Sequence, residues 1–437
     1  MNNIYVLDTN VLLDDPTAIF DYEEHEIIIP LAVVEELDNQ KRKTSDIGYN
    51  ARETSRILDE LRLKGRLNEG IKLKNGSILK IVIDKKELKL PPHLSASKYD
   101  NRILTTAIDL QESNPEKEVI MVSNDINLRL IANAFDLKAE DHRGNGIDGE
   151  ELYDGFIEIK TKASIIDDFY ENQELDPDQL DGDFENLYPH QMIQLSTMDE
   201  RSKSALARYD GKKIVPLIFD KKAPMGITPL NREQKFAYEL LLNDDIRIVT
   251  MSGKAGTGKT LLALAAGLQK VINDKYYDRV LIARPVIPMG KDIGFLPGSV
   301  EEKLEPWMQP ILDNLNLIIH SNKGSYLSID QLIENNFIQI EALTYIRGRS
   351  IPNQYIIIDE AQNLSKHEVK TILTRAGKDS KIVLTGDPFQ IDNPYLNKVN
   401  NGLSQVANHF YKEQITGHIM LQKGERSEIA KIASELL

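Results

Sequence analysis

A glycine-rich segment that ends in a lysine and a threonine is the part of this sequence whose residue types and spacing most directly indicate chemistry. The segment reads GKAGTGKT and follows the apolar residues Ile246, Ile248 and Val249. Glycines allow successive backbone N–H groups to curl around a phosphate chain and to deliver it to a helix N-terminus, where the helix dipole favours anions. The spacing G-x-x-x-x-G-K-[ST] therefore predicts a nucleoside triphosphate site. The residues expected to bind the nucleotide are Gly253, Lys254, Ala255, Gly256, Thr257, Gly258, Lys259 and Thr260.

A pair of carboxylates further along the chain complements this loop. Lys259 is expected to reach the β- and γ-phosphates, and the Thr260 hydroxyl is expected to bind Mg²⁺. The apolar run QYIII, typical of a buried strand, ends in Asp359 and Glu360. We expect Asp359 to support the Mg²⁺ ion through Thr260 and water. Glu360 is then expected to act as the general base for an attacking water.

Two glutamines are predicted to read the nucleotide. Gln390 lies in GDPFQ, directly after the strand-like run KIVLT, where its side chain would sense the γ-phosphate. Gln234 lies in TPLNREQ, upstream of the first strand of this region, and is a candidate for the adenine edge. Adenine is therefore preferred to guanine, and the expected cofactor is ATP with Mg²⁺.

A second group of acidic residues lies in the first third of the chain. The strand-like run NIYVL ends at Asp8, and the run VIMV is followed by Ser-Asn and Asp125. Glu35 and Glu36 lie in one helix-like run, and Asp100 precedes another. Ligands gather at the C-terminal edge of open α/β sheets, and carboxylates that meet there need a cation because like charges repel. Mg²⁺ or Mn²⁺ suits such oxygen ligands and activates water for phosphodiester hydrolysis.

The order of these N-terminal motifs resembles that of the PIN nuclease domain over roughly residues 1 to 140. The matching segments are VLDTNVLL, VVEELD, SKYDNRIL and VSNDINLR. The resemblance implies a metal-dependent nuclease site in which Asn10 and Ser123 are supporting polar groups and Glu35 is a rival to Glu36. The implied acidic quartet, which would bind the metal and carry the catalysis, is Asp8, Glu36, Asp100 and Asp125.

The C-terminal half resembles the PhoH family of single-core ATPases over roughly residues 226 to 437. The segments ARP, GFLPG, YIRGR and ERSEI occur in the expected order. The DEAQ and GDPFQ segments are also similar to motifs of superfamily 1 helicases. Residues 391–437 are nevertheless too few for the second RecA-like core that those helicases use to close the ATP site. PIN and PhoH regions in one chain imply a known type of fusion protein.

The joint resemblance implies an ATP-dependent RNA-processing enzyme. In it, ATP hydrolysis would drive the unwinding or threading of single-stranded RNA, and the PIN site would cleave RNA with a divalent metal. The alternative is a remodelling or regulatory ATPase whose PIN fold only binds RNA or a partner protein. The acidic set favours the enzyme, since a domain used only for binding has no need to keep it.

The ATPase also needs an arginine to neutralise the charge that grows on the transferred phosphoryl group. We expect this arginine either from the same chain, as Arg426, or from a neighbouring subunit, with Arg347 and Arg349 as alternatives. A head-to-tail interface that closes forms a ring. The resemblance to PhoH proteins implies a hexameric ring, so a homo-hexamer is predicted, with the GFLPG loop around Phe295 lining a central pore.

Composition is that of a chain with ordinary folded cores. Of the 437 residues, 41% are hydrophobic and none is cysteine, which excludes disulfides and thiolate metal sites. No run approaches the ~18 apolar residues of a membrane helix. Because the N-terminus has no signal-peptide pattern, a cytoplasmic protein is expected. The predicted fold class is α/β, with a PIN-like parallel-sheet domain (1–140), a linker and small β-rich module (141–225) and a RecA-like P-loop core (226–437).

The net charge of −15 argues against a general nucleic-acid coat, so local basic patches matter more than the sum. An Asn75-Gly76 pair between alternating runs predicts a β-hairpin. This hairpin either guides a nucleic-acid strand or is an ordinary solvated surface. Its basic residues are Lys64, Arg66, Lys72, Lys74, Lys80, Lys85, Lys86 and Lys89. Stronger candidates, in or beside the PhoH motifs, are Arg284, Lys291, Arg347 and Arg349.

Overall fold

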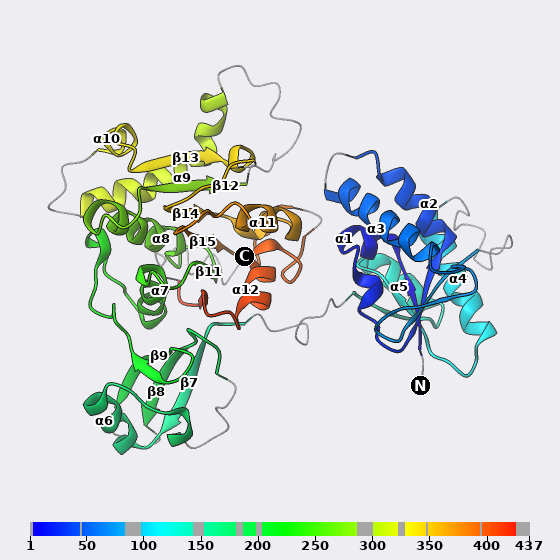
Figure 1. Cartoon of the computed structure of the whole chain (residues 1–437), viewed down its shortest axis with the longest axis horizontal. Coiled ribbons are helices and arrows are strands. Elements are labelled where there is room, and N and C mark those ends of the chain that lie inside the picture. The colour runs from blue at the N-terminus through cyan, green and yellow to red at the C-terminus, as the bar shows by residue number, and fades with distance from the viewer. Residues whose placement is uncertain are drawn as a thin grey trace. The chain divides into compact units, whose positions relative to one another are not determined.

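The chain forms two compact units, Met1–Gly149 (unit 1) and Glu150–Leu437 (unit 2) (Figure 1). The structure is a computed structural model, and the residues that it describes are 3–43, 46–83, 98–142, 153–180, 187–197, 203–285, 300–321, 328–346, 348–393 and 396–424. No helix in these ranges is long and apolar enough to cross a membrane.

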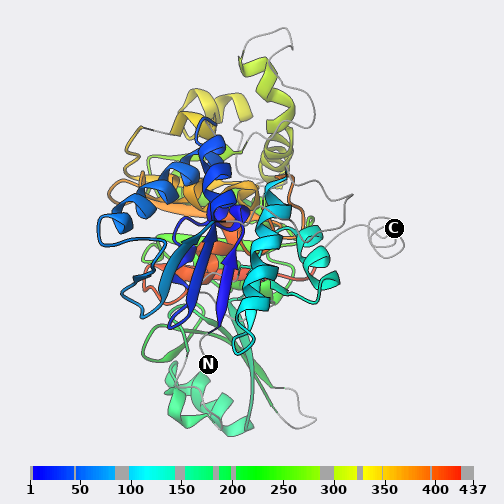
Figure 2. The ribbon, with the colours of Figure 1, turned by 90° about the vertical axis from the view of Figure 1, so that its right-hand side faces the viewer.

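Unit 1 is built on a six-stranded sheet with the order β3-β4-β2-β1-β5-β6. Neighbouring strands are parallel, except that β3 and β4 form an antiparallel pair. Figure 2 shows these strands side by side, with helices α4 and α5 (cyan) next to them. The strands are β1 (Ile4–Leu7), β2 (Glu26–Pro30), β3 (Ile71–Lys72), β4 (Ile78–Val82), β5 (Val119–Val122) and β6 (Lys138–Glu140).

Helices α1, α2 and α5 of unit 1 begin at or just after the ends of strands. Asp8 follows β1 and caps α1 by accepting a hydrogen bond from the Thr9 amide, and Asp125 caps α5 in the same way through Asn127. The central strands β1, β2 and β5 are apolar and buried, which is typical of parallel strands covered on both faces. The helices are α1 (Thr9–Asp14), α2 (Leu31–Gln40), α3 (Asp46–Arg62), α4 (Tyr99–Ser113) and α5 (Ile126–Ala134).

The predicted hairpin at Asn75-Gly76 is confirmed as the β3–β4 pair. Gly76 has a φ of 85°, a left-handed conformation that glycine adopts without strain. The charge of this hairpin is partly neutralised, because Lys80 pairs with Glu26, which also pairs with Lys117. Lys85, Lys86 and Lys89 lie outside the described residues.

The first part of unit 2 is a four-stranded sheet with the order β10-β9-β8-β7, which we call the connecting module. It packs on the rest of unit 2 through a buried ion pair from Arg208 to Glu239 (3.3 Å) and a hydrogen bond between His190 Nε2 and the Gln414 carbonyl (2.8 Å). The connecting module is therefore attached to the remainder of unit 2. Its elements are β7 (Phe156–Thr161), α6 (Ala163–Asn172), β8 (Met192–Thr197), β9 (Ser204–Tyr209) and β10 (Ile214–Pro216).

The remainder of unit 2 surrounds a parallel six-stranded sheet with the order β13-β12-β14-β15-β11-β16. The C-terminal ends of β11, β14 and β15 are neighbours at one edge, which is where open parallel sheets bind ligands. The predicted α/β class is confirmed. The strands are β11 (Ile248–Gly253), β12 (Arg279–Arg284), β13 (Ile338–Ala342), β14 (Gln354–Ile358), β15 (Lys381–Gly386) and β16 (Thr416–Leu421). The helices are α7 (Arg232–Leu242), α8 (Lys259–Leu268), α9 (Val300–Ser321), α10 (Ile329–Glu334), α11 (Lys366–Leu373) and α12 (Gly402–Phe410).

Candidate functional sites

The glycine-rich loop joins the end of β11 to the start of α8 and requires glycine at particular positions. Gly253, Gly256 and Gly258 have φ values of 149°, 81° and 92°, which side chains rarely allow. A Cβ on Gly253 would also lie 2.3 Å from the carbonyl oxygen of Leu421 on β16. Thr257 closes the loop by donating from Oγ1 to the Lys254 carbonyl (2.9 Å). The loop thus has the backbone freedom and the position that a phosphate cradle needs.

The ammonium group of Lys259 lies inside this loop. The residue is 8% exposed, and Nζ donates to the carbonyl oxygens of Gly253 (2.6 Å) and Lys254 (3.0 Å). These carbonyls hold the positive charge at the mouth of the loop, where phosphate oxygens of a bound nucleotide would compete for it.

Asp359 connects the loop to the two neighbouring strands. One of its oxygens, Oδ1, accepts hydrogen bonds from Thr260 Oγ1 (2.8 Å) and from Thr385 Oγ1 (2.7 Å). The three residues come from α8, from the end of β14 and from β15, and Asp359 is 4% exposed. A hydroxyl and a carboxylate that meet beside a phosphate loop are the donor set that Mg²⁺ prefers at nucleotide sites.

Glu360 is held in a strained backbone conformation with each carboxylate oxygen engaged. Its φ is 55°, in the left-handed region. Oε1 lies 3.2 Å from Nη2 of Arg284 at the end of β12, and Oε2 accepts from Nε2 of Gln362 (2.6 Å). Strain that the surroundings maintain is common at functional sites, and here it orients the carboxylate that the sequence suggested as a base.

Gln362 and Asp387 contact the candidate site, although the sequence reasoning did not single them out as site residues. Gln362 is fully buried; besides Glu360, its Nε2 binds the Gln390 carbonyl (2.9 Å), and its Oε1 accepts from the Asp387 amide (3.1 Å). Asp387 in turn accepts from the amide of Ala255 in the phosphate loop (3.1 Å). The signal was present, since Gln362 closes DEAQ and Asp387 opens the polar segment after a buried strand.

The two glutamines predicted to read the nucleotide differ in their surroundings. Gln234 is 4% exposed and braces the phosphate loop, because its Oε1 accepts from the Leu230 amide (2.7 Å) and its Nε2 donates to the Thr257 carbonyl (3.1 Å). The side chain of Gln390 is exposed, while its backbone carbonyl is tied to Gln362. Contact with adenine and sensing of the γ-phosphate stay predictions.

Several predicted residues of unit 2 lie outside the described residues. They are the arginine donors Arg347 and Arg426, the basic residue Lys291 and the pore loop around Phe295. Arg349 is described, and its Nη1 lies 3.0 and 3.2 Å from the two carboxylate oxygens of Glu341 on β13. Within the chain this arginine therefore has a carboxylate partner.

In unit 1 the centre of the acidic group is Asp8. It is 2% exposed, and its two oxygens accept from the Thr9 amide (2.6 Å) and from Ser123 Oγ (2.7 Å). Burial raises the pKa of this carboxyl from 3.8 to about 7, and the charges of Asp100 and Glu36 act in the same direction. A buried carboxylate among like charges is a costly arrangement that a bound cation would relieve.

Glu35 and Glu36 point to different partners. Glu36 accepts from Thr9 Oγ1 (2.6 Å), next to Asp8, and burial together with the Asp100 charge raises its pKa. Glu35 instead pairs with Arg102 (2.5 Å). The geometry therefore places Glu36 with Asp8.

Asn10 and Ser123 form the polar support that was expected around these acids. Ser123 Oγ donates to Asp8 and accepts from Asn10 Nδ2 (3.1 Å) and from the Asp125 amide (3.0 Å). Asn10 Oδ1 also accepts from the Asn124 amide (3.0 Å). The network fixes the end of β1 to the end of β5.

Asp100 and Asp125 complete the group electrostatically. The pKa of Asp100 is raised by burial and then by the Asp125 charge. Asp125 is exposed and caps α5.

The four carboxylates share one region, but their oxygen atoms do not form a compact set of metal ligands. Within the described ranges, the cluster whose ligand atoms all lie within 4.8 Å of one another is a different one, formed by Asp15, Asp21 and His142. The donor set of the quartet, all oxygen and partly buried, fits Mg²⁺ or Mn²⁺.

Comparison with known families agrees with the two halves of this description. The PIN domain family matches residues 5–143, and the PhoH-like protein family matches residues 226–435. The chain is 47% identical over 446 residues to Protein PhoH2 of Bacillus subtilis (strain 168), with 100% of both chains covered. The chain belongs to the PhoH2 family.

Other PhoH2 proteins share this full-length organisation. Protein PhoH2 of Mycolicibacterium smegmatis is 34% identical and that of Thermobispora bispora 33%, each match covering 99% of this chain and 96% of the relative. The predicted resemblance to PIN and PhoH proteins is confirmed. This PhoH2-family chain thus carries a nuclease-like PIN domain and a P-loop NTPase domain of the PhoH type.

Proposed function

We propose that this PhoH2-family chain is an ATP-dependent RNA-processing enzyme. Its ATPase unit hydrolyses ATP to unwind or thread single-stranded RNA, and its PIN unit cleaves RNA with a divalent metal. The observation that supports the ATPase most directly is the meeting of Thr260, Asp359 and Thr385 beside a glycine loop that carries Lys259. Three separate segments supply these groups, so a chance glycine turn does not account for them.

Each residue of the ATP site has a distinct task in this proposal. The backbone amides of the loop and Lys259 bind the β- and γ-phosphates, and Thr260 and Asp359 hold Mg²⁺. Mg²⁺ neutralises charge that develops on the phosphates when it is bound. Glu360 accepts the proton of the attacking water, while Arg284 and Gln362 hold its carboxylate in place. General-base catalysis of this kind contributes about 10²–10⁴-fold.

Asp8, Glu36, Asp100 and Asp125 hold the metal of the PIN site, with Mg²⁺ or Mn²⁺ as the ion. When bound, this ion would supply the activation of water that phosphodiester hydrolysis requires. Ser123 and Thr9 keep Asp8 and Glu36 oriented. Because the pKa of Asp8 is about 7, this carboxyl must lose its proton before it can act as a ligand.

The proposed assembly is a homo-hexameric ring. It is supported by the resemblance to PhoH proteins and by the need of the ATP site for an arginine, which either a neighbouring subunit or Arg426 would supply. Arg347 and Arg349 are the candidates for donation in trans. RNA as the substrate rests on the resemblance to PIN–PhoH proteins.

The ATPase part is tested with Lys259→Ala and Glu360→Gln in the full chain. We expect Lys259→Ala to weaken ATP binding and Glu360→Gln to keep binding but lose phosphate release by about 10²-fold or more. Binding is measured with a fluorescent ATP analogue and hydrolysis by phosphate release. Glu413→Gln, at an exposed position away from the site, is the matched control. Parental hydrolysis by Glu360→Gln would show that Glu360 is not the base.

A further inference from the structure

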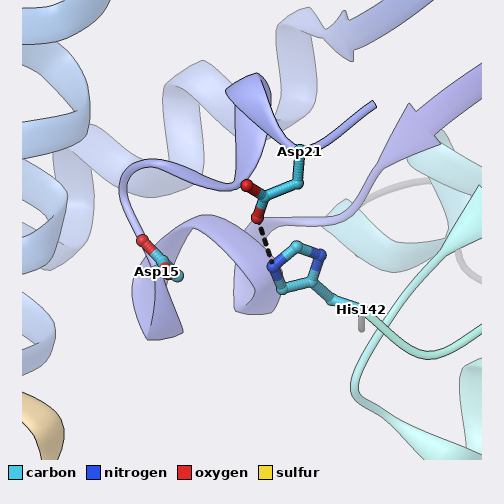
Figure 3. A group of neighbouring side chains, drawn as sticks. All are labelled: Asp15, Asp21 and His142. Carbon is cyan, nitrogen blue, oxygen red and sulfur yellow. Dashed lines mark ion pairs between the residues drawn. The ribbon is translucent and has the colours of Figure 1, made fainter. Parts of the chain in front are cut away.

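A second polar cluster in unit 1 lies apart from the acidic quartet and consists of Asp15, Asp21 and His142 (Figure 3). Asp15 follows the last residue of α1, Asp21 follows the short 3₁₀ helix Ala18–Phe20, and His142 lies two residues beyond β6. One ligand atom from each of these residues lies within 4.8 Å of the other two. Two carboxylates from one short segment thus meet an imidazole that is more than a hundred positions away in the sequence.

The imidazole of His142 is the most informative member of this cluster. Its side chain is only 4% exposed, and its Nε2 atom has no hydrogen-bond partner among the described residues. Nε2 points toward Asp21, with 3.4 Å to Oδ2. Buried polar atoms are normally satisfied, so a buried ring nitrogen that faces Asp21, with the Asp15 carboxylate also nearby, needs an explanation.

The other ring nitrogen of His142 already has a partner. Nδ1 lies 2.9 Å from the hydroxyl of Tyr22. A phenol hydroxyl can accept a hydrogen bond, and Nδ1–H donated to Tyr22 would leave the Nε2 lone pair directed at the carboxylates. Metal-binding histidines generally donate their second ring N–H to a nearby oxygen acceptor, which fixes the tautomer and the ring, and the Tyr22 hydroxyl can serve as that acceptor here.

The orientation of Asp15 is also fixed. Its Oδ1 accepts from the Thr17 amide (2.8 Å) and from Thr17 Oγ1 (2.6 Å). Two ionised carboxylates and a neutral imidazole together carry a formal charge of about −2. A divalent cation balances this charge, whereas a protonated imidazole balances only half of it.

We propose that Asp15, Asp21 and His142 form a divalent transition-metal site of the zinc type, separate from the PIN carboxylates. Imidazole nitrogen together with carboxylate oxygen suits Zn²⁺, while all-oxygen sets suit Mg²⁺. The cluster and Asp8 flank opposite ends of α1, a helix of six residues and therefore ~9 Å long. The ion would link the segment that follows β6 to the segment that follows α1.

Titration of the EDTA-stripped full chain with ZnCl₂, followed by calorimetry, tests this site. Because the ATP site and the quartet are also proposed to bind metal, the variants are compared with the parent. We expect His142→Gln and Asp21→Asn to bind one Zn²⁺ per chain fewer than the parent, or to bind that ion at least about tenfold more weakly. The matched control is His25→Gln, the same substitution in the same unit, whose ring bonds the Asn3 amide instead. A second control, Asp8→Asn, should keep this ion while altering the quartet.

Hydrogen exchange read by mass spectrometry gives a second readout that does not depend on stoichiometry. Zn²⁺ should slow exchange in peptides that cover residues 15–22 and 138–142 of the parent and of His25→Gln, and not of His142→Gln. If His142→Gln does not fold, Asp15→Asn, at a half-exposed position, replaces it. Equal Zn²⁺ binding and equal protection in the parent and the cluster variants would overturn the proposal, as would a loss of Zn²⁺ in Asp8→Asn alone.

Discussion

Removal of the Asp8 charge should stabilise unit 1 in the absence of metal, although Asp8 is a proposed catalytic residue. Burial raises the pKa of this carboxyl from 3.8 to about 7. Between these two pH values the folded state keeps a proton that the unfolded state loses, so the free energy of unfolding falls as pH rises. Above about pH 7 the free energy of unfolding falls no further, because Asp8 is then ionised in both states.

The pKa difference sets the size of the effect. With a pKa raised from 3.8 to about 7, and at 1.36 kcal/mol per pKa unit, Asp8 lowers the free energy of unfolding by about 4 kcal/mol at pH 8 and by about 1.5 kcal/mol at pH 5, relative to low pH. Asn has the shape of the protonated acid and can still accept from the Thr9 amide. Asp8→Asn should therefore exceed the parent in stability by those amounts, and the difference should vanish near pH 4.

The assay is urea unfolding of the full chain in EDTA, followed by hydrogen exchange of peptides from β1 and β5. Asp125→Asn is the matched control, since Asp125 also caps a helix but is exposed, and its replacement should change stability by less than about 0.5 kcal/mol. Added Mn²⁺ should stabilise the parent and leave Asp8→Asn unchanged. An Asp8→Asn protein that is no more stable than the parent at pH 8 would refute the argument that this acid is buried at a cost.

Three further predictions concern the other site residues. Gln362→Ala should lower kcat for ATP about 10²-fold at a nearly unchanged KM, because Gln362 bonds Glu360 directly and reaches the phosphate loop only through Asp387. Steady-state kinetics would show a raised KM if Gln362 acted in nucleotide binding instead. Glu36→Gln should abolish the stabilisation of unit 1 by metal, while Glu35→Gln, which loses only the contact to Arg102, should keep it. Thermal unfolding at increasing Mn²⁺ concentrations measures this, and stabilisation of Glu36→Gln but not of Glu35→Gln would make Glu35 the ligand. Light scattering at working concentration should give a hexamer, and a fully active monomer would leave only Arg426 as the source of the arginine.

The parts that sequence predicted well are those encoded locally. The phosphate loop has its spacing within eight consecutive residues, and the strand before it and the helix after it are adjacent in the chain. The hairpin at Asn75-Gly76 is similarly local. Because such features depend on neighbouring residues, their chemistry can be recognised before the fold is known.

The parts that sequence did not reveal depend on which strands are neighbours. Arg284 meets Glu360 because β14 lies beside β12, and Asp387 meets Ala255 because β15 lies beside β11. Glu35 and Glu36 are adjacent in sequence, so only their tertiary partners separate them. No sequence motif marks His142, because the carboxylates that it meets in the fold are more than a hundred positions away.

The central claim, that one chain carries an ATPase and a separate metal-dependent ribonuclease, is tested most directly by one cleavage experiment. Labelled single-stranded RNA is incubated with Mn²⁺ and ATP and with the full-length parent, Asp8→Asn or Glu360→Gln, while phosphate release is followed in the same tubes. We expect Asp8→Asn to lose cleavage about 10²-fold or more while it keeps ATP turnover, and Glu360→Gln to lose ATP turnover. Cleavage by Asp8→Asn at the parental rate, in preparations free of contaminating nuclease, would contradict the account. No cleavage by a parent that hydrolyses ATP would instead indicate a PIN domain that only binds.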